Sequence, residues 1–171
     1  GAILFTDRIE KFIPPKKGKS HILRILRELL FFEPIGKKTN LRLGLEYLNK
    51  VIKKRNISFL ISDFYDNNFE DPLKLVSKKH DLIAVHLIDP TEKELPALGL
   101  IKFVDAETGE DIWVDSTNNV IRKKYSEYWI KNKQNLDKLF LKSKVDKIEI
   151  NIDKSYLNPL IDFFKRRSKR Y

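Results

Sequence analysis

The sequence predicts a layered α/β fold in which strands alternate with helices around a mostly parallel sheet. Two near-continuous apolar runs, residues 57–61 and 81–90, are typical of the buried strands of a parallel sheet. Between them, residues 72–79 have the spacing of an amphipathic helix. Because parallel strands need a crossover connection, this order predicts right-handed β-α-β units.

The first 60 residues are expected to begin with two short strands, residues 2–5 and 9–13, joined by the turn at Thr6 to Arg8. Pro14 and Pro15 end the second strand, since proline cannot donate to a ladder. Ser20 is expected to cap the helix that follows. Two amphipathic helices then show apolar residues at helical spacing: Ile22, Leu23, Leu26, Leu29 and Leu30 in the first, which Pro34 and Gly36 end, and Leu41, Leu45, Leu48 and Ile52 in the second.

After residue 90 the alternation is interrupted. Residues 100–104 and 111–114 alternate with period two around residues 107–110, which predicts a β-hairpin inserted at about residues 98–115. Residues 118–142 form the longest predicted helix, and residues 147–152 form a half-exposed strand. We interpret the aromatic and aliphatic stripe of the long helix as core packing; it consists of Tyr125, Tyr128, Trp129, Leu136, Leu139 and Phe140.

The chain is expected to end in a basic helix and tail, residues 155–171, with Ser155 as the helix cap and apolar positions at Leu157, Leu160, Ile161 and Phe164. With 171 residues and 42% hydrophobic residues, we expect one domain over residues 1–171. The chain opens directly in a strand and contains no Met, so we interpret it as a piece of a longer protein.

Composition excludes several kinds of site. The chain has no Cys, so it has no disulfide, no thiolate metal site and no Cys nucleophile, which fits a cytoplasmic location. No apolar run approaches the roughly 20 residues of a membrane span, although an upstream segment of the parent protein could carry an anchor. Gly18-Lys19-Ser20 imitates the end of a phosphate-binding loop, but Ile13 stands where that motif needs glycine.

The net charge of +10 is unevenly distributed. Lys and Arg outnumber Asp and Glu by 14 to 5 in residues 1–60 and by 15 to 6 in residues 118–171, whereas residues 61–117 have 5 against 13. A bipolar surface of this kind suits a protein partner of mixed charge at least as well as a phosphate backbone.

Asp63 follows the apolar run 57–61, which places its carboxylate at the carboxyl edge of the sheet, where open α/β sheets gather their ligands. Thr39 ends a loop before the next helix and could reach the same edge. Both side chains offer hard oxygen ligands for a divalent cation. Each also has a simpler interpretation, Asp63 as a turn former and Thr39 as a helix N-cap. We interpret Asp7, Asp66 and Asp89 as turn residues.

An ordered set of segments resembles a bacterial family. The segments are Gly1 to Asp7, Phe12 to Gly18, Gly36 to Thr39, Leu60 to Phe64 and Leu160 to Arg167. Together they resemble the von Willebrand factor A-like proteins catalogued as domain of unknown function number 58, whose genes lie beside those of MoxR-type AAA+ ATPases. The resemblance covers essentially the whole chain.

The resemblance implies a three-layer Rossmann-like domain with a metal-ion-dependent adhesion site. In such sites an Asp-x-Ser-x-Ser strand, a Thr and an Asp hold the cation, and Thr39 and Asp63 match the last two. The Asp-x-Ser-x-Ser strand, central in the sheet, has no counterpart in this chain. The resemblance therefore implies Mg²⁺ in the parent protein and weak or no metal binding by this fragment. It also implies open strand edges, which a second copy could fill by sheet augmentation to form a homo-oligomer.

These observations favour an interaction module that is not an enzyme. The resemblance implies an adaptor or co-chaperone for a MoxR-type AAA+ ATPase or its client, with Lys37 and Lys38 attracting an acidic partner. The alternative is a nucleic-acid-binding module that uses Lys16, Lys17, Lys19 and the basic tail. A third hypothesis, a magnesium-dependent phosphatase-like enzyme, would need several convergent carboxylates, and only Asp63 is well placed.

Overall fold

The computed structural model describes residues 1–104 and 109–169. Its centre is a parallel three-stranded sheet of order β3-β4-β7, formed by β3 (Ile57–Ser62), β4 (Asp81–Ile88) and β7 (Asp146–Asn151). The predicted α/β class and mostly parallel sheet are confirmed. Ile57 pairs with Asp81 and Ile83 with Asp146, so all three strands run in one direction and share one carboxyl end.

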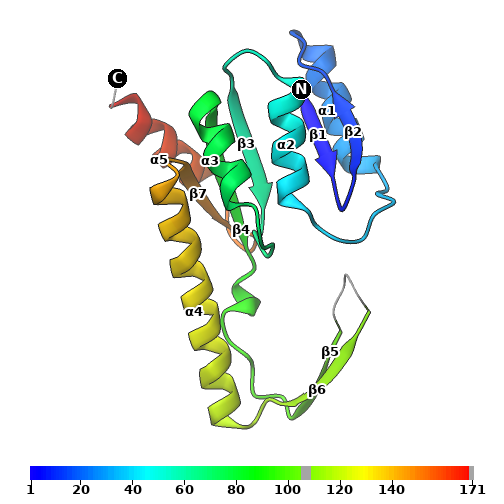
Figure 1. The fold of residues 1–171 in the computed structure, drawn as a ribbon. Helices are drawn as coiled ribbons and strands as arrows, with labels where there is room; N and C mark the ends of the chain where they lie inside the picture. The colour runs from blue at the N-terminus through cyan, green and yellow to red at the C-terminus, as the bar shows by residue number, and fades with distance from the viewer. Residues whose placement is uncertain (105–108, 170–171) are drawn as a thin grey trace.

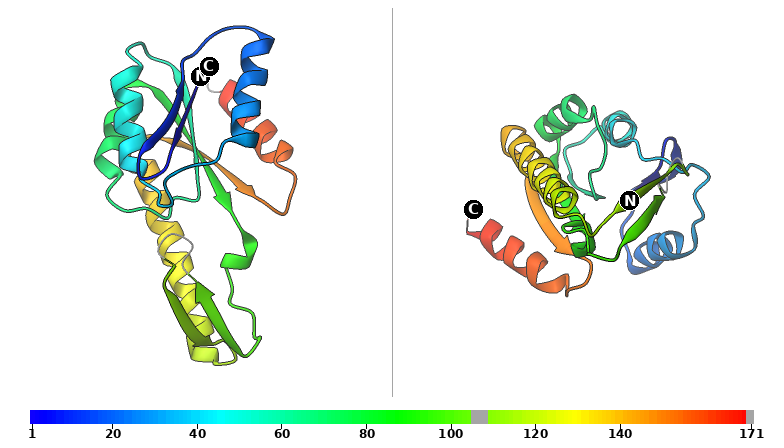
Figure 2. Two further views of the ribbon diagram at one scale, coloured as in Figure 1. Left: turned by 90° about the vertical axis from the view of Figure 1, so that its right-hand side faces the viewer. Right: turned by 90° about the horizontal axis from the view of Figure 1, so that it is seen from below.

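Helices cover both faces of this sheet (Figures 1 and 2). On one face lie α2 (Leu41–Val51), α3 (Glu70–Lys79) and the last turns of α4 (Asn119–Lys142). On the other face α5 (Leu157–Ser168) packs through Phe163 on β4 and β7. This arrangement gives the three layers that the alternation of strands and helices predicts.

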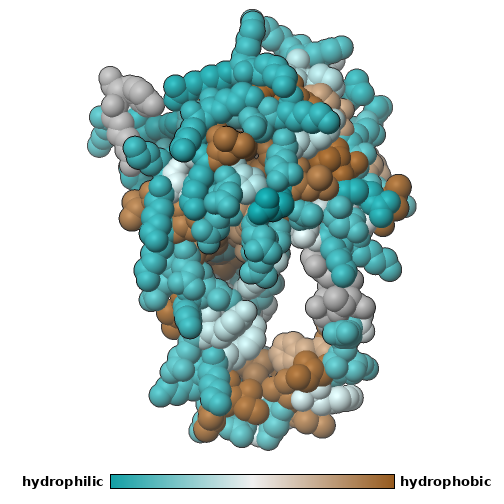
Figure 3. Space-filling view, viewed as in Figure 1, coloured by the Kyte–Doolittle hydropathy of each residue, from teal (hydrophilic) through white to brown (hydrophobic). Residues whose placement is uncertain are grey.

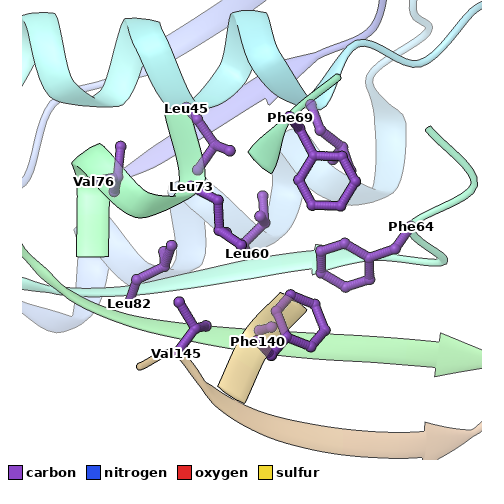
Figure 4. Packing of buried hydrophobic residues seen from close by; sticks show 11 residues of the cluster. Leu45, Leu60, Phe64, Phe69, Leu73, Val76, Leu82, Phe140 and Val145 are labelled. Atoms are coloured by element: carbon purple, nitrogen blue, oxygen red, sulfur yellow. The ribbon is translucent and has the colours of Figure 1, made fainter. Parts of the chain in front are cut away.

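The main core lies between the sheet and α2, α3 and α4 (Figure 4). The rings of Phe64 and Phe140 meet edge to face with centroids 5.1 Å apart. Phe5 and Leu48 pack at the margin of this core. The residues buried in it are Leu41, Leu45, Leu60, Phe64, Phe69, Leu73, Val76, Leu82, Ala84, Phe140 and Val145.

The first two strands do not join the central sheet. β1 (Ala2–Phe5) and β2 (Ile9–Ile13) form a separate antiparallel hairpin, which contacts α2. Within the described residues β1 pairs with β2 alone and β3 pairs with β4 alone. The outer edges of β1 and β3 therefore have no strand partner among the described residues.

The helix α1 (Lys19–Phe31) has no buried residue, although its apolar residues recur at helical spacing. It begins after Gly18, whose φ of 107° suits glycine, and no side chain caps it. The prediction that Ser20 is the cap is wrong, because Ser20 already lies within the first turn. The N-cap of α5 is Tyr156 and not the predicted Ser155, although the Ser155 hydroxyl accepts a hydrogen bond from the amide of Leu157.

The inserted hairpin is present as β5 (Leu100–Val104) and β6 (Asp111–Asp115), which follow the short 3-10 helix η1 (Pro90–Glu92). Its turn was predicted at residues 107–110, and residues 107 and 108 lie outside the described residues. The buried hydroxyl of Ser116 closes the base of the hairpin by donating to Gly99 O and accepting from Leu98 N.

The long helix α4 corrects one interpretation in part. Of its predicted core stripe Phe140 is buried, and Leu136 and Leu139 pack against the main core. Tyr128, by contrast, is 65% exposed. Figure 1 shows why: the first part of α4 runs past the end of the sheet toward the hairpin, so no strand lies beneath it. In the described part of the chain, no helix is both long enough and apolar enough to cross a membrane.

Candidate functional site

The loops that carry Thr39 and Asp63 are joined at the carboxyl edge of the sheet. Asp63 follows the last residue of β3, and Thr39 lies two residues before the first residue of α2. The carboxylate of Asp66 accepts a hydrogen bond from the amide of Leu41 over 2.6 Å. This contact links the segment after β3 to the start of α2. Both candidate residues are exposed there, and Thr39 has an interaction partner.

The loop before α2 is fixed from its other side by the first hairpin. Glu10 accepts hydrogen bonds from the amides of Ile35 and Gly36, and the bond from Gly36 is the main reason that the pKa of Glu10 is lowered. Gly36 allows this approach, because a Cβ atom there would lie 2.1 Å from Thr6 Oγ1. Asn40, rather than Thr39, is the N-cap of α2, and it accepts from Leu43 N.

The Asp63 carboxylate forms part of a turn. Its Oδ1 atom accepts from the Ser62 hydroxyl and from the Tyr65 amide, each over 3.2 Å. Lys37 and Lys38 are exposed, and neither forms an ion pair with a described residue. The turn role of Asp63 leaves its second carboxylate oxygen, Oδ2, facing no hydrogen-bond donor among the described residues.

The donors at this edge fit part of a magnesium site. Thr39 and Asp63 offer two hard oxygens, and Mg²⁺ usually keeps several water ligands when a protein binds it through one or two side chains. Residues 1–104 and 109–169 contain no group of three or more His, Cys, Asp and Glu side chains that could hold a metal ion. The magnesium site at Thr39 and Asp63 therefore stays a prediction.

A cavity of about 390 Å³ opens beside Asp63, between the segment after β3, the end of β4 and the exposed part of α4. Burial, together with the nearby carboxylate of Glu92, raises the pKa of Tyr65 to about 12. Burial and the charge of Asp89 also raise the pKa of Glu92. Tyr128 and Trp129 of α4 line the opposite wall. The part of α4 that leaves the core thus forms one side of a polar, aromatic cavity.

Lys133 and His86 of the cavity lining belong to or adjoin a charged network. Glu149 of β7 accepts from Lys133 over 2.5 Å and from Lys147 over 2.6 Å, and Asp137 pairs with both lysines. Burial alone would raise the pKa of Glu149, but the bonds from the two lysines lower it to about 2. His86 lies beneath the network with its Nδ1 atom buried and unpartnered among the described residues, and burial lowers its pKa.

Sequence reasoning missed two contributors to this edge. Asp66 was interpreted as a turn residue, but its carboxylate joins two loops that are 25 residues apart. Glu92 lies after β4 on η1, and nothing in its local pattern indicates a partner at Tyr65. Of the other two predicted turn residues, Asp89 caps η1 through Thr91, and Asp7 accepts from its neighbours Thr6 and Arg8.

Replacing Asp66 with alanine should destabilise the fold by about 1 kcal/mol, because the first amide of α2 loses its acceptor. The free energy of unfolding in urea, followed by circular dichroism, measures this loss. Asp71→Ala is the matched control, since Asp71 is exposed on α3 and contributes only a surface ion pair to Lys74. Equal losses in the two variants would contradict the linking role of Asp66.

The basic residues of the nucleic-acid alternative are exposed but separate. Lys16 and Lys17 lie between β2 and α1, and Lys19 is the first residue of α1. Lys165, Arg166 and Lys169 lie at the end of α5. Tail residues 170 and 171 lie outside the described residues. Hydrophilic residues gather over the end of the molecule at which α2 and α3 finish, and apolar residues gather around the hairpin at the opposite end (Figure 3).

Comparison with known proteins identifies mycobacterial relatives that match this chain over 100 to 112 residues. The chain is 28% identical to "Uncharacterized protein Mb1516" of Mycobacterium bovis and to "Uncharacterized protein Rv1480" of Mycobacterium tuberculosis, over 112 residues that make up 64% of the chain. That match covers 35% of each of these relatives, so the chain spans only part of their length. It is also 29% identical to "Uncharacterized protein MAV169" of Mycobacterium avium, over 57% of the chain and 59% of that protein.

No solved structure matches the chain. A family model described as "Protein of unknown function DUF58" matches residues 1–135, which is most of the chain and includes Thr39, Asp63 and the inserted hairpin. The chain therefore belongs to the DUF58 family of proteins of unknown function.

Proposed function

We propose that this chain is a protein-interaction module rather than an enzyme, and that it serves as an adaptor or co-chaperone for a MoxR-type AAA+ ATPase. The observation that carries the proposal is the open edge and uncovered face of β3. On that face Ile57, Phe59 and Ile61 are 63%, 46% and 61% exposed. Exposed apolar residues on an unpaired strand are typical of a surface that binds another polypeptide.

Strand addition is the contact that this edge favours. A partner segment in extended conformation would pair with the main-chain groups of β3, and these hydrogen bonds would provide affinity. It would also cover the apolar side chains of β3, which would select partner sequences with alternating apolar residues. A second copy of the chain could supply such a segment and form a homo-oligomer. The exposed apolar residues of α1 would enlarge the same kind of contact.

The carboxyl edge supplies a second contact in this proposal. A Mg²⁺ ion held by Thr39 and Asp63 would have an open position for an acidic side chain of the partner, because a hard cation prefers carboxylate oxygen. Lys37 and Lys38 lie on the same loop as Thr39 and would attract that acidic ligand. The joining of the two loops by Asp66 and Leu41 supports this arrangement.

The test measures binding of the purified chain to a MoxR-type ATPase from the same genome, by biolayer interferometry with Mg²⁺ or with EDTA. We expect Phe59→Lys to weaken binding at least tenfold, because a charge would replace an apolar contact. We expect Asp63→Ala or EDTA to weaken it as well. Asp71→Ala, which changes an exposed carboxylate on α3, should leave binding unchanged.

Each arm of this test can fail separately. Binding that survives both EDTA and Asp63→Ala would remove the ion from the proposal but retain the edge of β3. Binding that survives Phe59→Lys would remove the strand contact. Absence of any binding to the ATPase would reject this class of partner.

A further inference from the structure

The amino end of the sheet gathers cations from three connections and from the end of α5. Figure 1 shows that β3, β4 and β7 begin at the same end of the molecule and that α2, α3, α4 and α5 all run toward it. Basic residues suit the final turns of helices, because the C-terminal end of a helix dipole is negative. Nine exposed cations result: Lys53, Lys54, Arg55, Lys78, Lys142, Lys144, Lys165, Arg166 and Lys169.

A hydrogen bond and two ion pairs join these segments into one surface, which we call the amino-end surface. The amide of Asp81 donates to the carbonyl of Asn56 over 2.8 Å, which ties the start of β4 to the α2–β3 connection. Arg167 of α5 pairs with Asp81 and with Asp146, the first residues of β4 and β7. The three connections and the end of α5 therefore lie together although they are far apart in the sequence.

The carboxylates within this surface already form ion pairs, whereas its nine exposed cations form none among the described residues. Asp81 and Asp146 both face Arg167. None of the nine cations forms an ion pair with a carboxylate of the described residues. The exposed carboxylate nearby is Asp162, one turn before Arg166 on α5. The amino-end surface thus has a strong positive excess that nothing in the described chain neutralises.

A concave site lies at the margin of this surface. A cavity of about 600 Å³ opens between α5 and β7, and Lys165, Arg166 and Lys169 reach it from the last turns of α5. Lys147 also lines it, together with the carboxylates of Asp162 and of Glu149, which is paired with two lysines. Ile148 and Pro159 form its apolar wall. Three cations beside an apolar wall offer a place for a phosphate group that is attached to an apolar body.

Exposed aliphatic side chains accompany the cations. Leu141 is 80% exposed beside Lys142, and Ile57 is exposed two residues after Arg55. Proteins that hold single-stranded nucleic acid present rows of aromatic platforms to the bases. Here the exposed side chains beside the cations are the aliphatic Leu141 and Ile57, with the single ring of Phe164 next to Lys165. These features suit a lipid surface better than a nucleic acid.

We propose that the amino-end surface binds an anionic phospholipid bilayer, with cations on the headgroup phosphates, Leu141 in the interfacial region and the cavity beside α5 over one headgroup. Basic residues near an anionic membrane are attracted within a Debye length, which is about 8 Å at physiological salt. The carboxyl edge of the sheet, with Thr39 and Asp63, lies at the other end of the strands and stays accessible to a protein partner.

The test is co-sedimentation of the chain with phosphatidylcholine vesicles, with or without about 30% phosphatidylglycerol. We expect at least tenfold more bound protein on the anionic vesicles, and loss of that binding at high salt. The triple variant K53E/K54E/R55E should reduce binding at least tenfold, and K142E/K144E should reduce it severalfold. All five substituted side chains are exposed, so both variants should retain the fold, which thermal unfolding checks.

The matched control is K123E/K124E/K131E, which makes the same change in net charge on the part of α4 that is remote from the amino end. It should bind nearly as well as the original chain. Equal effects of the two triple variants would overturn the proposal, because total charge and not this surface would then decide binding. Failure to bind anionic vesicles at low salt would also overturn it, as would binding to a single-stranded oligonucleotide with no binding to vesicles.

Discussion

Replacing Phe140 with alanine should lower the free energy of unfolding by about 3–5 kcal/mol, the range found when a large buried aromatic residue is removed. Phe140 is 2% exposed and lies in the last turn of α4, where its ring meets that of Phe64 (Figure 4). Its loss would leave a cavity between α4 and the sheet. The position matters because α4 has no other buried residue.

Urea denaturation followed by circular dichroism measures this effect. Leu141→Ala is the matched control on the next residue, since Leu141 is 80% exposed and its replacement should change stability by less than about 0.5 kcal/mol. Phe140→Leu should give an intermediate loss, because leucine fills part of the cavity. If Phe140→Ala proved as mild as Leu141→Ala, then α4 would not be fixed to the sheet through this residue.

Acid should destabilise the protein in two steps. His86 has its pKa lowered by burial, so the unfolded chain binds a proton more readily than the folded chain once the pH falls below 6.5. Glu149 has a pKa of about 2 instead of 4.5, so its contribution is complete above pH 4.5 and is lost as the pH falls toward 2. Protonation of carboxylates also raises a net charge that is already +10 at neutral pH.

Glu149→Gln separates the second step from the first. At pH 7 this variant should be less stable than the original chain, because Lys133 and Lys147 lose a charged acceptor. Between pH 4.5 and 2 its melting temperature should fall less steeply. Glu127→Gln serves as control, because Glu127 forms only an exposed ion pair with Lys123 on the outer part of α4. Parallel curves for all three proteins below pH 4.5 would contradict the assignment to Glu149.

The positions of the strands could be predicted from the sequence, whereas the pairing between strands could not. The runs at residues 57–61 and 81–90 identified two core strands, because a strand buried on one or both faces must be apolar in a way that local composition reveals. The same reasoning placed Asp63 at the carboxyl edge. Pairing could not be read in this way: β1 and β2 are apolar enough for a central sheet, yet they form a separate hairpin.

Contacts between segments that are distant in the sequence could not be predicted either, because local composition does not show which segments meet. The acceptor role of Asp66 depends on the end of β3 meeting the start of α2, and the aromatic stripe of α4 depends on where the sheet stops beneath the helix. An amphipathic pattern states that one face of a helix avoids water, but a cavity wall satisfies it as well as a core does. Tyr128 and Trp129 line such a wall.

The hydrogen bonds of Ser116 at the base of the inserted hairpin have a consequence for the evolution of this chain. One hydroxyl joins both ends of the arm formed by β5 and β6, and neither strand contributes to the two buried clusters. Mutations in the arm should therefore change the stability of the fold little, and selection for stability should act on them weakly. Relatives should differ there in length and composition while conserving a small hydroxylated residue at its neck, and an unrelated peptide grafted between residues 100 and 115 should be tolerated.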